Sequence, residues 1–150
     1  MTKSFEDIFS ELQSDMVSIG LEYVNNKADY IYIYCACENK MLTFDLFYKI
    51  NGKFLHKHKV NDAGNGFEYN VSMERMRQVL HIGTDDLEKI YALCKNDNRE
   101  MPTEIKIIYN VQTNSFEAQY SYDLQYSNKD NLTSDDIFEQ WFNEVSSNNG

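Results

Sequence analysis

The sequence contains little that would divide or interrupt a fold. It has one proline and six glycines in 150 residues, and neither residue gathers into a linker. We therefore expect a single domain over residues 1–150, with residues 146–150 as a frayed tail. No apolar run approaches the roughly 18 residues that a membrane-spanning helix needs. The first residues include Glu6 and Asp7, and acidic residues are atypical of a signal peptide. These absences predict a cytoplasmic protein without a membrane partner.

Positive charge is also scarce. The chain has 14 lysines and arginines against 24 aspartates and glutamates, which gives a formal charge of −10. A field of this sign repels phosphate backbones and attracts basic partners, so it argues against direct nucleic-acid binding. Acidity also serves solubility alone. Composition does not choose between a basic partner and solubility.

Motifs for catalysis or cofactor binding are missing. The chain has no P-loop, dinucleotide-binding fingerprint or nucleophile elbow. Of its three cysteines, Cys35 and Cys37 lack the spacing of zinc or redox sites, so we expect reduced, partly buried thiols. His56 and His58 would share one face of a strand, but the sequence indicates no third metal ligand. We assign both pairs structural roles.

Two pairs of carboxylates remain as candidates for acid–base chemistry. They are Asp85-Asp86 and Asp135-Asp136, and both pairs are expected in first turns of helices. There, capping and the helix dipole explain acidic side chains without catalysis. We therefore expect no enzyme, no cofactor and no metal. A small-molecule-binding domain stays as a less favoured alternative.

Three strand-like runs within residues 30–60 are the most regular part of the sequence. They are separated by Glu38-Asn39-Lys40 and by Asn51-Gly52. An Asn-Gly pair between apolar runs is a strong signal for a type I′ hairpin. Alternation gives the first run a tyrosine face opposite an aliphatic face. We expect an antiparallel meander whose third strand covers residues 53–60.

The rest of the chain alternates between helical and strand periodicity. A helix is predicted over residues 5–23 after Ser4, and another begins after Ser72. The sequence does not decide whether Gly83 breaks or bends this second helix. Strands are predicted over residues 104–110 and 116–122, and Thr133 or Ser134 begins a last helix. The predicted fold class is α+β: an antiparallel sheet of about five strands, a three-stranded meander plus a hairpin, packed against N-terminal, central and C-terminal helices.

Acidic and aromatic side chains gather toward the C-terminal end. Residues 96–150 hold ten acidic and three basic residues, together with Tyr120, Tyr122, Tyr126 and Trp141. A protein interface uses such a combination to attract and then anchor a basic partner. The alternative is that the tyrosines complete the core of the sheet while the carboxylates solvate it.

Three stretches resemble a known family. They are DYIYIYCACENKMLTFDLFYKINGKFLHKHKVND, IGTDDLEKIYALCKNDNREMPTEIKIIYNVQTNSFEAQYSYDLQYS and DDIFEQWFNEV. In hydrophobic pattern and element order they are similar to the YezG-like proteins of Firmicutes. Those are small cytosolic immunity proteins, or antitoxins, that accompany secreted polymorphic toxins, often nucleases. The family has no catalytic motif to carry over.

The resemblance implies stoichiometric binding of a cognate basic toxin domain. Carboxylates would pair with the lysines and arginines that a nuclease uses for phosphates, and aromatic anchors would slow dissociation. We expect the richest part of this surface at Asp123, Tyr126, Asp130, Asp135, Asp136 and Glu139. A structural or homo-oligomeric module is the alternative, and a homodimer would then associate through the tyrosine face of Tyr30, Tyr32 and Tyr34.

Overall fold

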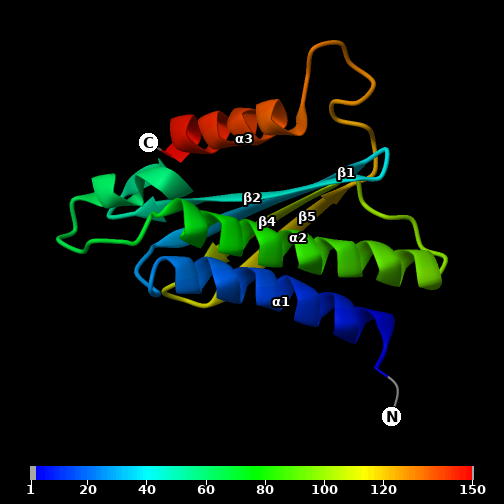
Figure 1. The fold of residues 1–150 in the computed structure, drawn as a ribbon, viewed down its shortest axis with the longest axis horizontal. Helices are drawn as coiled ribbons and strands as arrows, with labels where there is room; N and C mark the ends of the chain where they lie inside the picture. Colours follow the sequence, from blue (N-terminus) through cyan, green and yellow to red (C-terminus); the bar gives the residue numbers. More distant parts are fainter. Residues whose placement is uncertain (1–2, 150) are drawn as a thin grey trace.

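The computed structural model describes residues 3–149 and confirms the α+β fold. Three α-helices, one 3-10 helix and a five-stranded antiparallel sheet make up the described part of the chain (Figure 1). In chain order the elements are α1 (Phe5–Tyr23), β1 (Tyr30–Glu38), β2 (Met41–Ile50), β3 (Lys53–His56), η1 (Lys57–Ala63), α2 (Met73–Asn96), β4 (Glu104–Asn110), β5 (Ser115–Ser121) and α3 (Ser134–Asn149). None of the helices in residues 3–149 has the length and apolar character to cross a membrane.

The strands lie in the order β3-β2-β1-β4-β5, with β1 at the centre. Asn51 and Gly52 both have positive φ, 53° and 77°, as a type I′ turn between β2 and β3 requires. Asn39 and Lys40 adopt the same left-handed region between β1 and β2. The two tight turns set the register of the meander, which pairs Tyr30 with Lys49.

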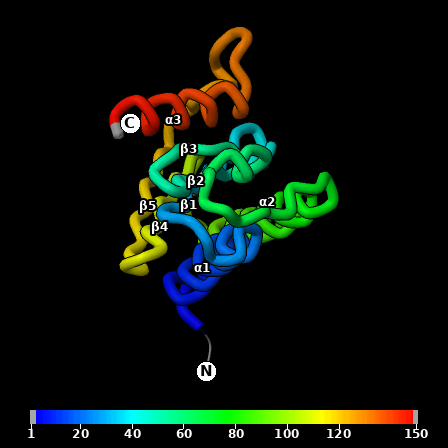
Figure 2. The backbone as a smooth tube through the Cα atoms, turned by 90° about the vertical axis from the view of Figure 1, so that its left-hand side faces the viewer, coloured from blue at the N-terminus to red at the C-terminus, as the bar shows by residue number. Residues whose placement is uncertain are grey.

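The sheet separates two layers of helices. Figure 1 and Figure 2 show α1 and α2 on one face and α3 on the other. Because side chains alternate along a strand, β1 sends Ile31 and Ile33 toward α1 and α2 while Tyr32 and Tyr34 contact α3. One alternative expected from the sequence was self-association through this tyrosine face. That placement is wrong, because α3 packs over Tyr32 and Tyr34 and buries both side chains.

The third strand is shorter than predicted. It ends at His56, and the chain then forms the 3-10 helix η1 instead of extending to residue 60. This turn buries Val60 and Ala63 in the main core. The Tyr23 hydroxyl also donates a hydrogen bond of 2.9 Å to the Lys57 carbonyl. Burial of two apolar side chains therefore overrides the strand periodicity after His56.

Helix α2 passes through Gly83 without a break. A Cβ atom at this position would lie 2.2 Å from the Phe44 ring, so the missing side chain lets α2 pack closely on β2. The predicted position of Asp85 and Asp86 in a first helical turn is wrong, because both lie in the middle of α2. Asp85 pairs instead with Lys89 at 3.2 Å, and Asp86 is buried.

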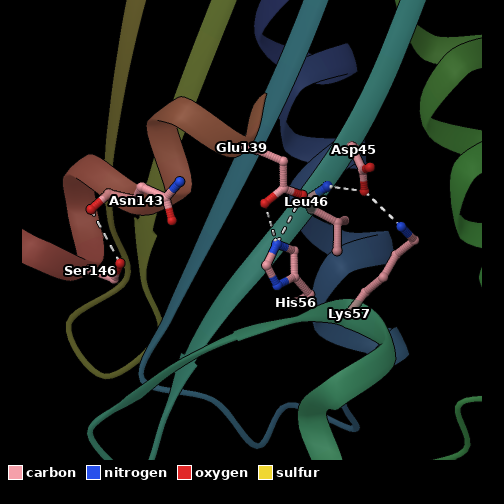
Figure 3. Close-up of polar contacts among 7 residues, drawn as sticks. All are labelled: Asp45, Leu46, His56, Lys57, Glu139, Asn143 and Ser146. Carbon is pink, nitrogen blue, oxygen red and sulfur yellow. Dashed lines mark hydrogen bonds and ion pairs between the residues drawn. The ribbon is translucent and has the colours of Figure 1, made fainter. Parts of the chain in front are cut away.

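Helix α3 extends further than expected. The sequence predicts a frayed tail over residues 146–150, whereas α3 includes residues 146–149, and Gly150 lies outside the described residues. The Ser146 hydroxyl donates a 3.3 Å hydrogen bond to the Asn143 carbonyl, within the last turns of the helix (Figure 3).

Candidate partner-binding surface

The six residues predicted to bind a partner all lie in the loop over residues 122–133 or in α3. These two segments contain six acidic residues and one lysine. They form the upper layer of Figure 1, on the face of the sheet opposite to α1 and α2. The carboxylates divide into two classes, those that hold this layer in place and those that have no partner.

Glu38, at the end of β1, anchors the loop. Its buried carboxylate accepts hydrogen bonds from the backbone N–H groups of Gln125 at 2.7 Å and Ser127 at 3.0 Å, and from the Ser127 hydroxyl at 2.6 Å. Burial alone would raise the pKa of Glu38, but these hydrogen bonds hold the pKa below its usual value. The charged carboxylate thus fixes the loop on the sheet.

Tyr126 does not belong to the surface. Its side chain is 9% exposed and packs in a cluster with the tyrosine face of β1 and the apolar side of α3. Trp141 is also buried there, with its ring centroid 5.2 Å from that of Phe47. For Tyr126 the alternative interpretation is confirmed, because it completes the core beneath α3, and Trp141 is buried in the same cluster.

Asp136 caps the helix that carries it. Its Oδ2 atom accepts a 2.9 Å hydrogen bond from the Thr133 backbone N–H, while the Asp136 N–H donates to the Thr133 hydroxyl at 3.3 Å. This reciprocal arrangement is a capping box. The Ser134 hydroxyl lies 2.8 Å from that of Thr43 and connects the start of α3 to β2.

Glu139 connects α3 to β3. Both of its carboxylate oxygens lie within hydrogen-bond distance of His56 Nε2, at 2.8 and 3.0 Å (Figure 3). The His56 ring also stacks on Phe142 with centroids 4.0 Å apart. Nearby, Lys57 Nζ lies 2.9 Å from Asp45 Oδ1, which also accepts a hydrogen bond from the Leu46 N–H (Figure 3). Like Asp136, Glu139 therefore has a partner inside the molecule.

Three of the predicted carboxylates are left without a partner. Asp123, Asp130 and Asp135 are exposed, and none has a side-chain hydrogen bond or ion pair within residues 3–149. We call these three residues the acidic surface. Two of them lie in the loop that Glu38 anchors, and Asp135 lies in the first turn of α3. The acidic surface therefore consists of carboxylates without internal partners. They lie on a layer, the loop over residues 122–133 and α3, that other carboxylates hold on the sheet; we call it the fixed layer.

A second exposed feature includes two of the aromatic residues that the sequence suggests as anchors, Tyr120 and Tyr122, and adds Phe116 and Leu124. Phe116, Tyr120, Tyr122 and Leu124 are 45%, 40%, 50% and 43% exposed, on β5 and directly after it. Alternation places Phe116, Tyr120 and Tyr122 on one face of the predicted strand, but periodicity does not reveal which strand lies at an edge. Tyr120 is held by a 2.8 Å hydrogen bond from Gln13 of α1 to its hydroxyl.

The buried carboxyl of Asp86 on α2 lies beside the exposed carboxyl of Asp15 on α1. Burial first, and then the hydrogen bond to Asp15 and its charge, raise the pKa of Asp86 from 3.8 to about 8. The raised pKa favours the protonated form of Asp86, which would donate to Asp15. Because Asp86 is 3% exposed, a substrate could not reach it, and we assign the pair a structural role.

The structure also places the cysteines and the histidine pair that the sequence singles out. All three cysteines are free and buried, as expected for core thiols. The rings of His56 and His58 lie 5.6 Å apart. Across residues 3–149, no three or more histidines, cysteines or carboxylates lie close enough together to hold a metal ion. No protein-family model matches the chain, and no curated protein has significant similarity to it.

Proposed function

We propose that this protein is a cytoplasmic immunity protein that binds and neutralises a basic toxin domain, with a nuclease as the expected class of toxin. The acidic surface is the observation that carries the proposal. Asp123, Asp130 and Asp135 expose carboxylates that satisfy nothing inside the molecule. The resemblance to YezG-like proteins and the formal charge of −10 support the same proposal.

Complementary charge explains how such a surface would recognise its partner. A nuclease domain presents lysines and arginines to the phosphates of its substrate, and carboxylates on an inhibitor satisfy the same groups. Attraction between opposite fields also accelerates encounter, which favours an inhibitor that must act before the toxin does.

The fixed layer lowers the entropic cost of binding. The anchor at Glu38, the capping box of Asp136 and the contact between Glu139 and His56 hold the loop and α3 before any partner arrives. Less conformational entropy is then lost on association. In this proposal the carboxylates with internal partners position the layer, and the free ones contact the toxin.

The proposal is tested by co-expression in cells. We expect the reading frame beside this gene to encode a secreted toxin with a basic C-terminal domain. Expression of that domain alone should stop growth, and expression of this chain with it should restore growth. Replacing Asp123, Asp130 and Asp135 together with lysine should abolish the protection.

A matched variant separates a specific surface from total charge. Three exposed acidic residues lie elsewhere: Asp62 in η1, Glu68 in the loop between η1 and α2, and Glu88 in α2. Replacing these three with lysine changes the net charge by the same amount and should preserve protection. If both triple variants protect equally, or if neither neighbouring frame encodes a toxin, the proposal is wrong.

A further inference from the structure

Strand β5 is an open edge of the sheet. It pairs with β4 on one side and has no strand on its other side among residues 3–149. At an edge, alternate backbone N–H and C=O groups point away from the sheet and can pair with another strand. The opposite edge strand, β3, has only four residues and leads directly into η1. The seven-residue β5 is therefore the longer and less covered edge.

Strand β5 has little of the usual protection of an edge, since Glu117 is its one charged residue. Natural edge strands are commonly blunted by lysine, proline or a bulge. The sequence of β5, SFEAQYS, has neither lysine nor proline, and its pairing with β4 is continuous from Ser115 to Ser121. Its Phe116 and Tyr120 expose about two fifths of their side chains or more toward the α1 side.

Helix α1 leaves space on both sides of Tyr120. One hollow of about 380 Å³ is lined by α1, Tyr109, Asn114 and Phe116. The other, of about 430 Å³, is lined by the start of α1 together with Pro102, Tyr120 and Tyr122. The apolar side of β5 is therefore accessible from the edge of the sheet, with room beside it for aromatic side chains.

The sequence of β5 is self-complementary about its central residue. Reading outward from Ala118, Glu117 matches Gln119, Phe116 matches Tyr120, and Ser115 matches Ser121. We propose that the occupant of this edge is a second copy of the chain, paired antiparallel through β5 with Ala118 opposite Ala118. A twofold axis through that position makes every pair other than Ala118 with Ala118 occur twice, as an isologous dimer interface requires.

Each pair in this register is chemically favourable. Phe116 of one copy lies opposite Tyr120 of the other, and aromatic cross-strand pairs are among the stabilising ones. Glu117 lies opposite the amide of Gln119, so like charges are not directly opposed. The pairing joins two sheets into one of ten strands and keeps α1 and α2 of both copies on the same side.

The dimer leaves the proposed toxin-binding residues Asp130 and Asp135 outside the paired strands. The inference is argued from the edge position and the sequence of β5, and it does not rest on the proposed function. Two chains of charge −10 repel each other at long range, and salt screens that repulsion. Dimerisation should consequently tighten with ionic strength, whereas binding to a basic partner should weaken.

Sedimentation velocity over a concentration series tests the dimer with the full chain. We expect a monomer–dimer equilibrium that shifts toward dimer at higher salt. Phe116→Asp should raise the dimer dissociation constant at least about tenfold, because the change removes two cross-strand pairs and adds two charges. Ile82→Asp, a matched change at an exposed apolar residue of α2, should leave it unchanged. Circular dichroism checks that both variants fold.

Cysteine cross-linking tests the register. Ala118→Cys places two thiols opposite each other on the twofold axis, so mild oxidation with copper phenanthroline should give a covalent dimer. Ser121→Cys places its thiols several residues apart and should remain monomeric on a denaturing gel. Any of three results would overturn the inference. They are a wild-type chain that is monomeric at all concentrations, an equal change in the dimer dissociation constant in Phe116→Asp and Ile82→Asp, and preferential cross-linking through residue 121.

Discussion

Gly83 of α2 lies directly against the ring of Phe44 on β2, so that a Cβ atom there would be 2.2 Å from the ring. Gly83→Ala should destabilise the protein by about 3 kcal/mol, because an overpacked core must shift a buried aromatic side chain or a whole helix. Gly20→Ala serves as a milder comparison, since a Cβ atom there would lie 3.3 Å from Ile31. It should lower the free energy of unfolding by less than Gly83→Ala does. Urea unfolding of both variants measures the difference. Equal stabilities would contradict the close packing of α2 on the sheet.

The buried carboxyl of Asp86 predicts an unusual dependence of stability on pH. Asp86 has a pKa of about 8 in the folded chain against an ordinary value of 3.8, so the folded state binds the proton more tightly. Its contribution to stability is complete below pH 3.8 and is lost as the pH rises through 8. Wild-type stability should therefore decline between neutral and mildly alkaline pH.

Asp86→Asn removes this dependence while keeping a donor toward Asp15. At pH 9 the variant should be more stable than wild type by roughly 1–3 kcal/mol, and its stability should vary less between pH 6 and 9. Asp85→Asn is the control, because Asp85 is exposed and pairs only with Lys89. Thermal unfolding across this pH range provides the measurement. Parallel pH profiles for wild type and Asp86→Asn would refute the assignment.

The contribution of Glu38 to stability should depend on pH with the opposite sign. Because the pKa of its carboxyl is lowered in the folded chain, the stability it adds is present above 4.5 and is lost as the pH falls through the folded value. Glu38→Gln should cost about 2 kcal/mol near neutral pH, since the charge-assisted hydrogen bonds to residues 125–127 are weakened. Hydrogen exchange should quicken at those amides. The exposed residue Glu144, replaced by Gln, should leave both stability and exchange unchanged.

Two neighbouring aspartates of α3 should respond differently to substitution. Asp136→Ala removes a capping-box partner and should destabilise the protein by about 1 kcal/mol. Asp135→Ala removes an exposed carboxylate without a partner and should change stability by less than about 0.5 kcal/mol. Chemical denaturation distinguishes the two. A larger loss for Asp135 would show that the acidic surface has a structural role.

Local patterns in the sequence were sufficient for most of the fold. Asn51-Gly52 predicted its hairpin because a type I′ turn demands positive φ, and Ser4 and Ser72 predicted the starts of α1 and α2 through their capping hydroxyls. Patterns failed where a distant contact decided the outcome. Burial of Val60 ends β3 early, and the sequence left open the outcome at Gly83, where α2 continues and packs closely on Phe44.

The surface was harder to predict than the fold. Its acidity was visible in composition, and capping was expected at Asp135-Asp136, but the pairing of Glu139 with His56 depends on a tertiary contact. Tyr126 is buried in a loop whose backbone is hydrogen-bonded to Glu38, a residue distant in sequence. The edge position of β5 likewise follows from strand order, which alternation of side chains does not encode.

The proposed recognition of a basic toxin is tested most directly by calorimetric titration of this chain with an inactivated toxin domain encoded beside it. The account predicts one toxin domain bound per chain and affinity that falls with salt. Replacing Asp123, Asp130 and Asp135 with lysine should weaken binding roughly 10–100-fold, since three exposed ion pairs become repulsive. The matched triple variant at Asp62, Glu68 and Glu88 should weaken it far less. Equal loss in the two variants, or binding that salt does not affect, would contradict the account.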